Sequence, residues 1–141
     1  MPAVFEYPIR VDSSHLDPNR HVNNVVYVQW MQDAALAHSS AQGWSTRRYR
    51  ELGVTWVSKT HIIEYHQQAF EGDEIMLTTW IADMLKISST RKYMVKRVSD
   101  GALLLTASTN WIMIDITKNR PVRIPLEIQQ SFEVVDNPPA A

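Results

Sequence analysis

The stretch from His15 to Ser40, "HLDPNRHVNNVVYVQWMQDAALAHSS", joins a polar cluster to the longest helical pattern in the chain. Its first ten residues contain one Asp, one Pro, two His, three Asn and one Arg. From Val22 onward, apolar residues recur every three or four positions as far as Ala41, which is typical of one face of an α-helix. Gly43 suits the C-terminal stop. The pattern predicts a long helix from about Asn23 to Gln42.

After Gly53 the apolar pattern changes from a helical period to a period of two, which is typical of strands. Four strands are predicted, within residues 54–66, 73–84, 88–98 and 101–115, and residues 5–11 form a fifth candidate before the helix. Pro125 can open a short terminal helix that runs to about Phe132. The order of these elements predicts one helix laid on a single antiparallel sheet.

The composition describes an ordinary globular chain of 141 residues, which predicts one domain over residues 1–141 with a frayed tail from about residue 134. Hydrophobic residues make up 45% and the formal net charge is −1, so the charge balance favours no nucleic-acid partner. The absence of Cys excludes disulfides, thiolate nucleophiles and Cys-based zinc sites. No apolar run is long enough to span a membrane, and the N-terminus lacks a signal-peptide pattern. We expect a cytoplasmic protein without a membrane partner.

The polar cluster lies where the first backbone N–H groups of a helix lack intrahelical partners and the helix dipole is positive. Asn23 and Asn24 can cap these groups, and Pro18 with Asn19 favours a bend that turns Asp17 back toward the helix. These residues can therefore be turn and cap residues only. Caps rarely need so many polar groups, and the alternative is a site that stabilises developing negative charge.

The segment "HLDPNRHVNNVVY" resembles the hotdog-fold acyl-CoA thioesterases of the 4-hydroxybenzoyl-CoA thioesterase type, which commonly carry Asp-x-x-Gly-His-Val-Asn-Asn-x-x-Tyr at this point. The matching residues are Asp17, His21, Val22, Asn23, Asn24 and Tyr27. The resemblance extends from about Phe5 to Phe132. It implies an α+β hotdog fold, in which a five-stranded antiparallel sheet wraps around one long central helix.

Two positions depart from the pattern. Arg20 replaces the Gly, which raises the question of whether the backbone there needs a positive φ that would strain an Arg. His15 stands where an acidic residue is frequent in the family.

The resemblance implies hydrolysis of an acyl-CoA thioester without a cofactor or metal. Asp17 would attack the thioester carbonyl or draw a proton from water, and the peptide N–H near Asn24 would polarise the carbonyl oxygen. His21 would orient the carboxylate or support the turn. Asn23 and Tyr27 are expected beside the substrate, although Tyr27 can equally be a core residue.

Coenzyme A carries phosphate charges, and the resemblance places "RK" residues of the family at the nucleotide. Arg91 and Lys92 match that pair, although they can also be charges that protect a strand edge. Family members pair edge to edge with the site at the dimer interface. We therefore expect a homodimer or a dimer of dimers.

A metal site is one alternative, because His15-x-Asp17 resembles the start of a two-His, one-carboxylate iron triad with His61 or His66 as third ligand. That triad normally lies on a many-stranded jelly roll, and a long helix occupies the place of those strands here.

Two further alternatives keep the hotdog fold. A hotdog enoyl-CoA hydratase uses an Asp and a His a few residues apart near the helix start, as Asp17 and His21 are. A non-catalytic dimer that binds an acyl-CoA or acyl carrier is the other, and it is favoured by the departures at Arg20 and His15.

Overall fold

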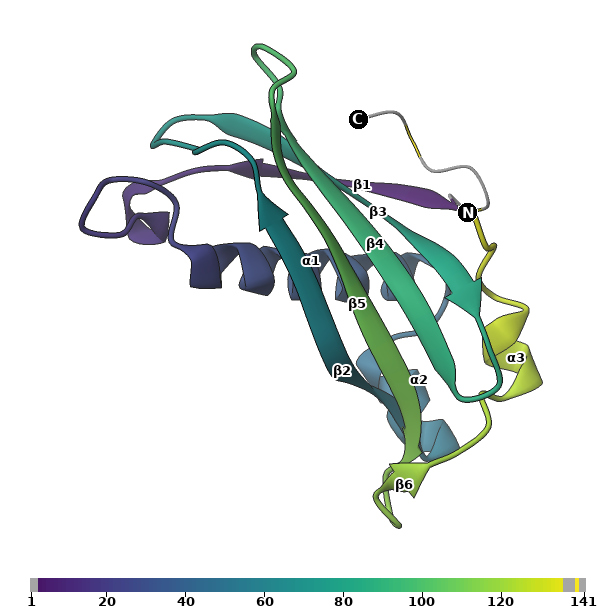
Figure 1. Ribbon diagram of the computed structural model, residues 1–141. Coiled ribbons are helices and arrows are strands. Elements are labelled where there is room, and N and C mark those ends of the chain that lie inside the picture. Colours follow the sequence, from purple (N-terminus) through teal and green to yellow (C-terminus); the bar gives the residue numbers. More distant parts are fainter. Residues whose placement is uncertain (1–2, 136–138, 140–141) are drawn as a thin grey trace.

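The computed structural model describes residues 3–135 and 139, and it shows an antiparallel sheet wrapped around one long helix (Figure 1). The strand order is β1-β3-β4-β5-β2, and a short β6 pairs with β5. The strands are β1 (Val4–Arg10), β2 (Val54–Tyr65), β3 (Glu74–Met84), β4 (Ser88–Arg97), β5 (Leu103–Asp115) and β6 (Arg120–Pro121). The predicted α+β hotdog fold and its five main strands are confirmed.

The central helix α1 (Asn24–Ala41) begins and ends within one residue of its predicted limits. Asn23 has an extended backbone, and its side-chain oxygen accepts a hydrogen bond from the Val25 N–H at 3.0 Å, so it is the N-cap. At the other end Gly43 takes φ 94°, a left-handed conformation that stops the helix.

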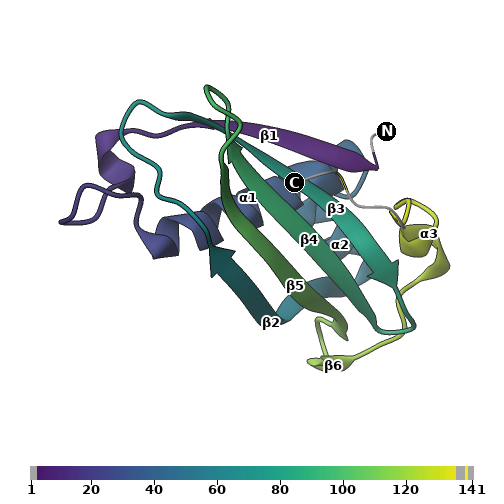
Figure 2. The ribbon, with the colours of Figure 1, turned by 45° about the horizontal axis from the view of Figure 1, so that its top comes forward.

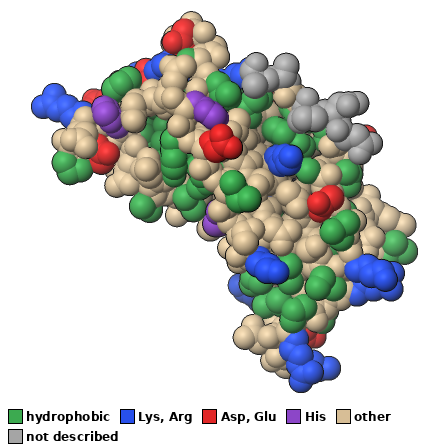
Figure 3. Space-filling model, in the orientation of Figure 1, with side chains coloured by type: hydrophobic (Ala, Val, Ile, Leu, Met, Phe, Trp, Pro, Cys, Tyr) green, Lys and Arg blue, Asp and Glu red, His purple; other side chains and the backbone are tan. Residues whose placement is uncertain are grey.

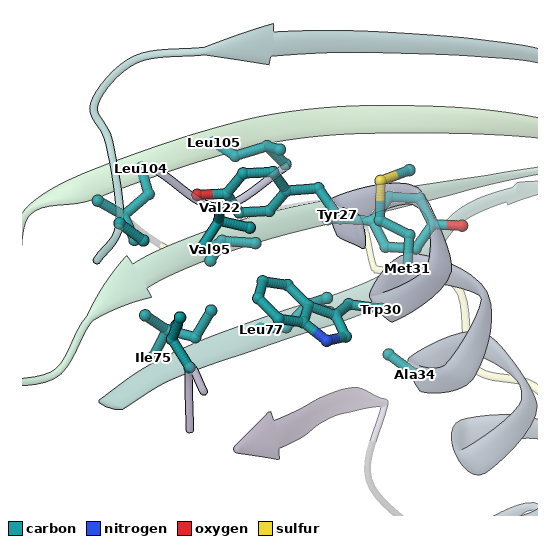
Figure 4. Close-up of a cluster of buried hydrophobic side chains, with 13 residues drawn as sticks. Val22, Tyr27, Trp30, Met31, Ala34, Ile75, Leu77, Val95, Leu104 and Leu105 are labelled. Carbon is teal, nitrogen blue, oxygen red and sulfur yellow. The ribbon is translucent and has the colours of Figure 1, made fainter. Parts of the chain in front are cut away.

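The buried face of α1 packs on the concave face of the sheet (Figure 4). Tyr27, Trp30, Met31 and Ala34 from the helix meet strand residues that include Ile75, Leu77, Val95 and Leu105. Most of the large apolar residues of the helix face the core as the pattern predicts, but Val25 is 72% exposed. The buried face also carries the polar residues His38 and Ser39, which the apolar pattern did not include.

A second cluster closes the far end of the helix, where the chain adds a helix that the pattern did not predict. The helix α2 (Thr46–Leu52) is capped by Ser45, whose hydroxyl accepts from the Arg48 N–H, and it ends at Gly53 with φ 84°. Tyr49 is its one buried residue. Figure 2 shows α2 behind the sheet, on the same side as α1, and α3 (Leu126–Gln129) beyond the end of β3.

The chain after α3 remains attached to the sheet. Val134 forms a parallel bridge with Ile81, and the Val135 N–H donates to the Ile81 carbonyl at 2.9 Å. Most of the tail predicted to fray from about residue 134 lies outside the described residues, because residues 136–138, 140 and 141 are not described. None of the helices in the described part of the chain combines the length and apolar composition that a membrane crossing needs.

Candidate active site

The residues from Leu16 to Val22 form a tight loop before α1. Leu16 and Val22 pair as an isolated antiparallel bridge, the Asp17 N–H donates to the His21 carbonyl at 2.8 Å, and the Arg20 N–H donates to the Asp17 carbonyl at 2.9 Å. Asp, then Pro at the second turn position, suits a type I turn, and the fourth position of such turns favours Gly. Arg20 occupies that position with φ 63°. The backbone therefore takes the left-handed conformation that favours Gly, although the residue here is Arg.

The loop orients one oxygen of the Asp17 carboxylate and leaves the other available. Oδ1 accepts hydrogen bonds from the Asn19 N–H at 2.8 Å and from the His21 N–H at 3.2 Å. Oδ2 makes no hydrogen bond within the described part of the chain, and the residue is only half buried. A carboxylate held on one side and open on the other can act on a substrate or a water molecule.

The first turn of α1 begins with a backbone donor that has no partner among the described residues. The Val25 N–H is bonded to the Asn23 side chain, and the Val26 N–H is bonded to the Asn23 carbonyl at 2.9 Å. The Asn23 N–H donates to the His15 carbonyl at 2.9 Å, which ties the helix start to the chain before the loop. Among the residues that the structure describes, the Asn24 N–H bonds to nothing. It lies at the positive end of the helix dipole, where a carbonyl oxygen that gains negative charge would be stabilised.

Aromatic side chains from the sheet side border this loop. The His21 ring makes an edge contact with the Phe70 ring at 5.5 Å, and Phe70 is 45% exposed. The Tyr65 hydroxyl donates to the Asn24 carbonyl at 3.4 Å. The same end of the molecule carries histidine and acidic side chains on the face shown in Figure 3. The loop, the helix start and the end of β2 thus form one partly polar, partly aromatic surface.

The side chain of His15 contacts Asp12 and Trp30. Its Nδ1 accepts a hydrogen bond from the Asp12 N–H at 3.0 Å, and its ring contacts Trp30 edge-on at 5.0 Å. His15 therefore caps the short 3-10 helix Ser13–His15 rather than facing Asp17. No group of three His, Asp or Glu side chains within residues 3–135 is arranged to hold a metal ion.

Tyr27 lies in the core, one turn into α1. It is 3% exposed, and its ring makes an edge contact with Trp30 at 5.3 Å. Its hydroxyl is buried without a hydrogen-bond partner in the described residues, and burial raises the pKa of Tyr27 to about 12. Of the two interpretations offered by the sequence, this placement fits a core residue.

Arg91 and Lys92 lie on opposite faces of β4 and form no shared basic surface. Lys92 is exposed on the outer face, whereas Arg91 points inward beneath α1 and is 4% exposed. Burial lowers the pKa of the Arg91 guanidinium. The strand alternation that separates them was visible in the sequence.

A cavity of about 280 Å³ lies beneath the second half of α1, away from the Asp17 loop. Its walls come from α1, α2 and the strands, and include Leu36, Tyr49, Trp56, Trp111 and Phe132. Of the residues predicted to form the site, Arg91 alone lines this cavity. The sequence did not indicate the cavity, because its walls join residues of α1, α2 and four strands that lie far apart in the chain.

A family model described as the thioesterase-like superfamily matches residues 11–132. The chain belongs to this superfamily. The match runs from the residue after β1 to Phe132 of the second core cluster, so it includes the whole candidate site and the cavity.

Relatives with assigned activities act on two kinds of acyl thioester. The chain is 22% identical over 128 residues to the long-chain acyl-CoA thioesterase FadM of Escherichia coli, covering 89% of this chain and 94% of that protein. It is 24% identical over 144 residues to the chloroplastic palmitoyl-acyl carrier protein thioesterase of Cuphea hookeriana, covering 96% of this chain and 35% of that protein. The chain thus spans about a third of the length of the plant thioesterases that it matches.

Solved structures share the fold at low sequence identity. A 1,4-dihydroxy-2-naphthoyl-CoA thioesterase from Synechocystis superposes with a TM-score of 0.85 at 18% identity, covering 96% of this chain and 99% of that chain. A Staphylococcus aureus protein in complex with CoA superposes with a TM-score of 0.85 at 20% identity, covering 91% of this chain and 80% of that chain. These likenesses establish the hotdog fold.

Proposed function

We propose that this chain hydrolyses an acyl-CoA thioester to the free acid and coenzyme A. One observation carries the proposal: the loop that orients the Asp17 carboxylate leads directly into the helix start where the Asn24 N–H has no partner. An acid or base and a donor for an oxyanion are the two groups that acyl transfer needs. The superfamily and the activities named for the relatives support the same reaction.

In this mechanism the thioester carbonyl lies at the helix start and accepts a hydrogen bond from the Asn24 N–H. Water attacks the carbonyl carbon and gives a proton to Asp17, the carbonyl oxygen gains negative charge, and collapse expels the CoA thiolate, which takes the proton from Asp17. In the nucleophilic variant, the Asp17 oxygen that has no hydrogen bond within the described residues attacks first and expels CoA as the thiolate. Water then hydrolyses the mixed anhydride to the free acid, which restores the Asp17 carboxylate, and the proton released protonates the thiolate. Both variants need the carboxylate ionised and unobstructed.

The surrounding residues position these two groups. We propose that His21 acts through its backbone N–H, which bonds to Asp17, and through its ring, which rests against Phe70. Asn23 caps the helix and so fixes the direction of the Asn24 N–H. Lys92, exposed on the outer face of β4, remains our proposed contact for the phosphates of CoA.

We also propose that two copies pair through β2. This strand ends the sheet, so one side of its backbone has no neighbouring strand in the described residues, and its Ile62 is 64% exposed. Val25 and Leu36 on α1 are 72% and 57% exposed. Figure 3 shows hydrophobic side chains at the surface near β2 and the start of α1. An apolar strand edge of this kind is normally covered.

Thiol release from a panel of thioesters tests the proposed reaction. The panel contains aryl, short, medium and long acyl-CoAs, with the matching acyl-acyl carrier proteins as the second carrier. The proposal expects turnover of at least one acyl-CoA, with release of one thiol per acid formed. Tight binding of acyl-CoAs with no thiol release would instead identify a binding module, and hydration of an enoyl-CoA without thiol release would identify a hydratase.

A further inference from the structure

Arg91 is a buried cation without an anionic partner. Its Nη1 donates to His38 Nδ1 at 3.0 Å and to Thr79 Oγ1 at 3.1 Å, and neither residue is acidic. No Asp or Glu in the described part of the chain forms an ion pair with it. Burying a charge without a counter-charge is costly, and proteins normally pair such a group or use it to bind a ligand.

The guanidinium lies at the wall of the cavity beneath α1. Arg has five N–H donors in a fixed fork, and Nε and Nη2 make no hydrogen bond to the described residues. Two polar groups nearby are already paired: the Ser39 hydroxyl with the Tyr49 hydroxyl at 2.8 Å, and the Trp56 indole with the same hydroxyl at 3.1 Å. The Trp111 indole N–H also lines the cavity and is buried without a partner among the described residues. Arg91 is the one charged side chain that the described residues contribute to the lining, so it adds a formal charge to this spare hydrogen-bonding capacity.

The rest of the wall suits an apolar body. Leu36, Ile81, Met84, Trp111 and Phe132 all line the cavity. An apolar lining with one convergent charged group is the usual composition of a small-molecule site, in which the charged group fixes the ligand's orientation. A carboxylate matches the geometry of an Arg fork better than any neutral acceptor, because it accepts two parallel N–H bonds and supplies the missing charge.

We propose that this cavity binds a ligand with an apolar body and a terminal carboxylate, and that the carboxylate is bound by Arg91. Two sources have this chemistry. One is a free acyl acid, such as the product of hydrolysis, and the other is an acyl thioester that carries a carboxylate at the end remote from sulfur. The second source rests on the function proposed above, whereas binding of the free acid does not.

Binding of octanoate and 1-octanol tests the proposal, since the two ligands differ only in the head group. Titrations of the whole protein at pH 7 are followed by calorimetry and by the fluorescence of Trp56 and Trp111, which line the cavity. A hydrogen-bonded charge pair predicts that octanoate binds at least about tenfold more tightly than octanol. Equal affinities, or tighter binding of octanol, would overturn the proposal without any variant.

Variants then assign the preference to Arg91. Arg91→Met removes the charge and keeps a long apolar side chain, so it should abolish the preference for octanoate while octanol still binds. Arg91→Lys keeps the charge without the fork and should retain a reduced preference, which covers the case in which Arg91→Met does not fold. Arg123→Met removes an exposed cation outside the cavity and should leave both affinities unchanged. A full preference for octanoate in folded Arg91→Met would overturn the assignment.

Hydrolysis kinetics distinguish the free acyl acid from an acyl thioester with a remote carboxylate as the ligand. If the cavity receives the remote end of the substrate, the chain must span about 18 Å, because Leu36 lies twelve residues along α1 from Asn24 at a rise of about 1.5 Å per residue. Hexadecanedioyl-CoA should then be hydrolysed with a kcat/KM above that of hexadecanoyl-CoA in wild type but not in Arg91→Met. If octanoate binds but hexadecanedioyl-CoA has no advantage, the ligand is the free acid. If octanoate binds and no thioester releases thiol, the proposed function fails and the carboxylate site stands.

Discussion

At the scale of single residues, Arg20 is the clearest point of backbone strain near the candidate site. Its φ of 63° costs a non-glycine residue about 1 kcal/mol or more. We predict that Arg20→Gly raises the free energy of unfolding by about 1 kcal/mol, because relief of the strain exceeds the greater chain entropy of Gly in the unfolded state. Thermal unfolding measures the change. Arg20→Ala keeps the Cβ and is the control, and an equal gain in both variants would mean that the Arg side chain, rather than the backbone, is the source.

Tyr27 supplies a prediction for pH. Its unpartnered buried hydroxyl should make Tyr27→Phe more stable than wild type at pH 7, by about 1 kcal/mol. Burial raises the pKa of Tyr27 from 10.0 to about 12, so the free energy of unfolding of wild type is unaffected by this group below pH 10 and falls as the pH rises from 10 toward 12. Phe does not ionise, so the difference in the free energy of unfolding between Tyr27→Phe and wild type should widen from pH 9 to pH 11. A difference that stays constant or narrows would show that the hydroxyl is solvated and its pKa is not raised.

The residue types of the candidate site could be predicted from the sequence, but their surroundings could not. Asp17 and Asn24 lie where the predicted bend and helix start place them. The placement of Arg91 beside His38 depends on packing between β4 and the far half of α1, and residues 53 positions apart leave no local pattern. The sequence offered only two indications of this contact, a His on the apolar face of the helix and an Arg on the inward face of a strand.

At the scale of elements, the start of α1 carries the proposed oxyanion donor, and two substitutions at one position can test it. Asn24→Pro removes the N–H, and Pro suits the first helical position because that N–H has no intrahelical partner. Asn23, with φ −63° and ψ 133°, already has the backbone that a following Pro requires. Asn24→Ala keeps the N–H. We predict that Asn24→Pro lowers kcat about 10²-fold or more, as loss of an oxyanion donor does, and that Asn24→Ala changes it much less. Equal losses would assign the effect to the side chain.

Long regular elements were predictable and short ones were not. The strands and α1 have many residues that share one period, which fixed their positions closely. The helix α2 has seven residues, of which only Tyr49 is buried. One buried residue does not define an apolar period, so the sequence pattern did not predict this helix. Its formation depends on Tyr49 packing against Trp44 at 5.1 Å. The helix α3 (Leu126–Gln129) is shorter than the helix predicted for residues 125–132. It also has a single buried residue, Ile128, and therefore no apolar period that could set its limits.

At the scale of the whole molecule, the exposed β2 edge predicts a dimer. Sedimentation at micromolar concentration should show a dimer or a dimer of dimers for wild type, and a shift toward monomer for Ile62→Lys, because a lysine at an apolar strand edge opposes pairing. Leu126→Lys places the same charge at a 66% exposed position of α3 and should keep the assembly. A monomeric wild type would remove the proposed interface, and an unaltered Ile62→Lys would move it away from β2.

We propose that the carboxylate of Asp17 carries out thioester hydrolysis at the start of α1. The most direct test is the kcat/KM of Asp17→Asn for the best acyl-CoA, because the amide keeps the size of the side chain and an oxygen that can accept the Asn19 and His21 N–H bonds. We predict a loss of about 10² to 10⁴ with the fold unchanged, as expected for a positioned acid or base. Nearly full activity in Asp17→Asn, together with its abolition in His21→Ala, would make Asp17 a turn residue and contradict the account.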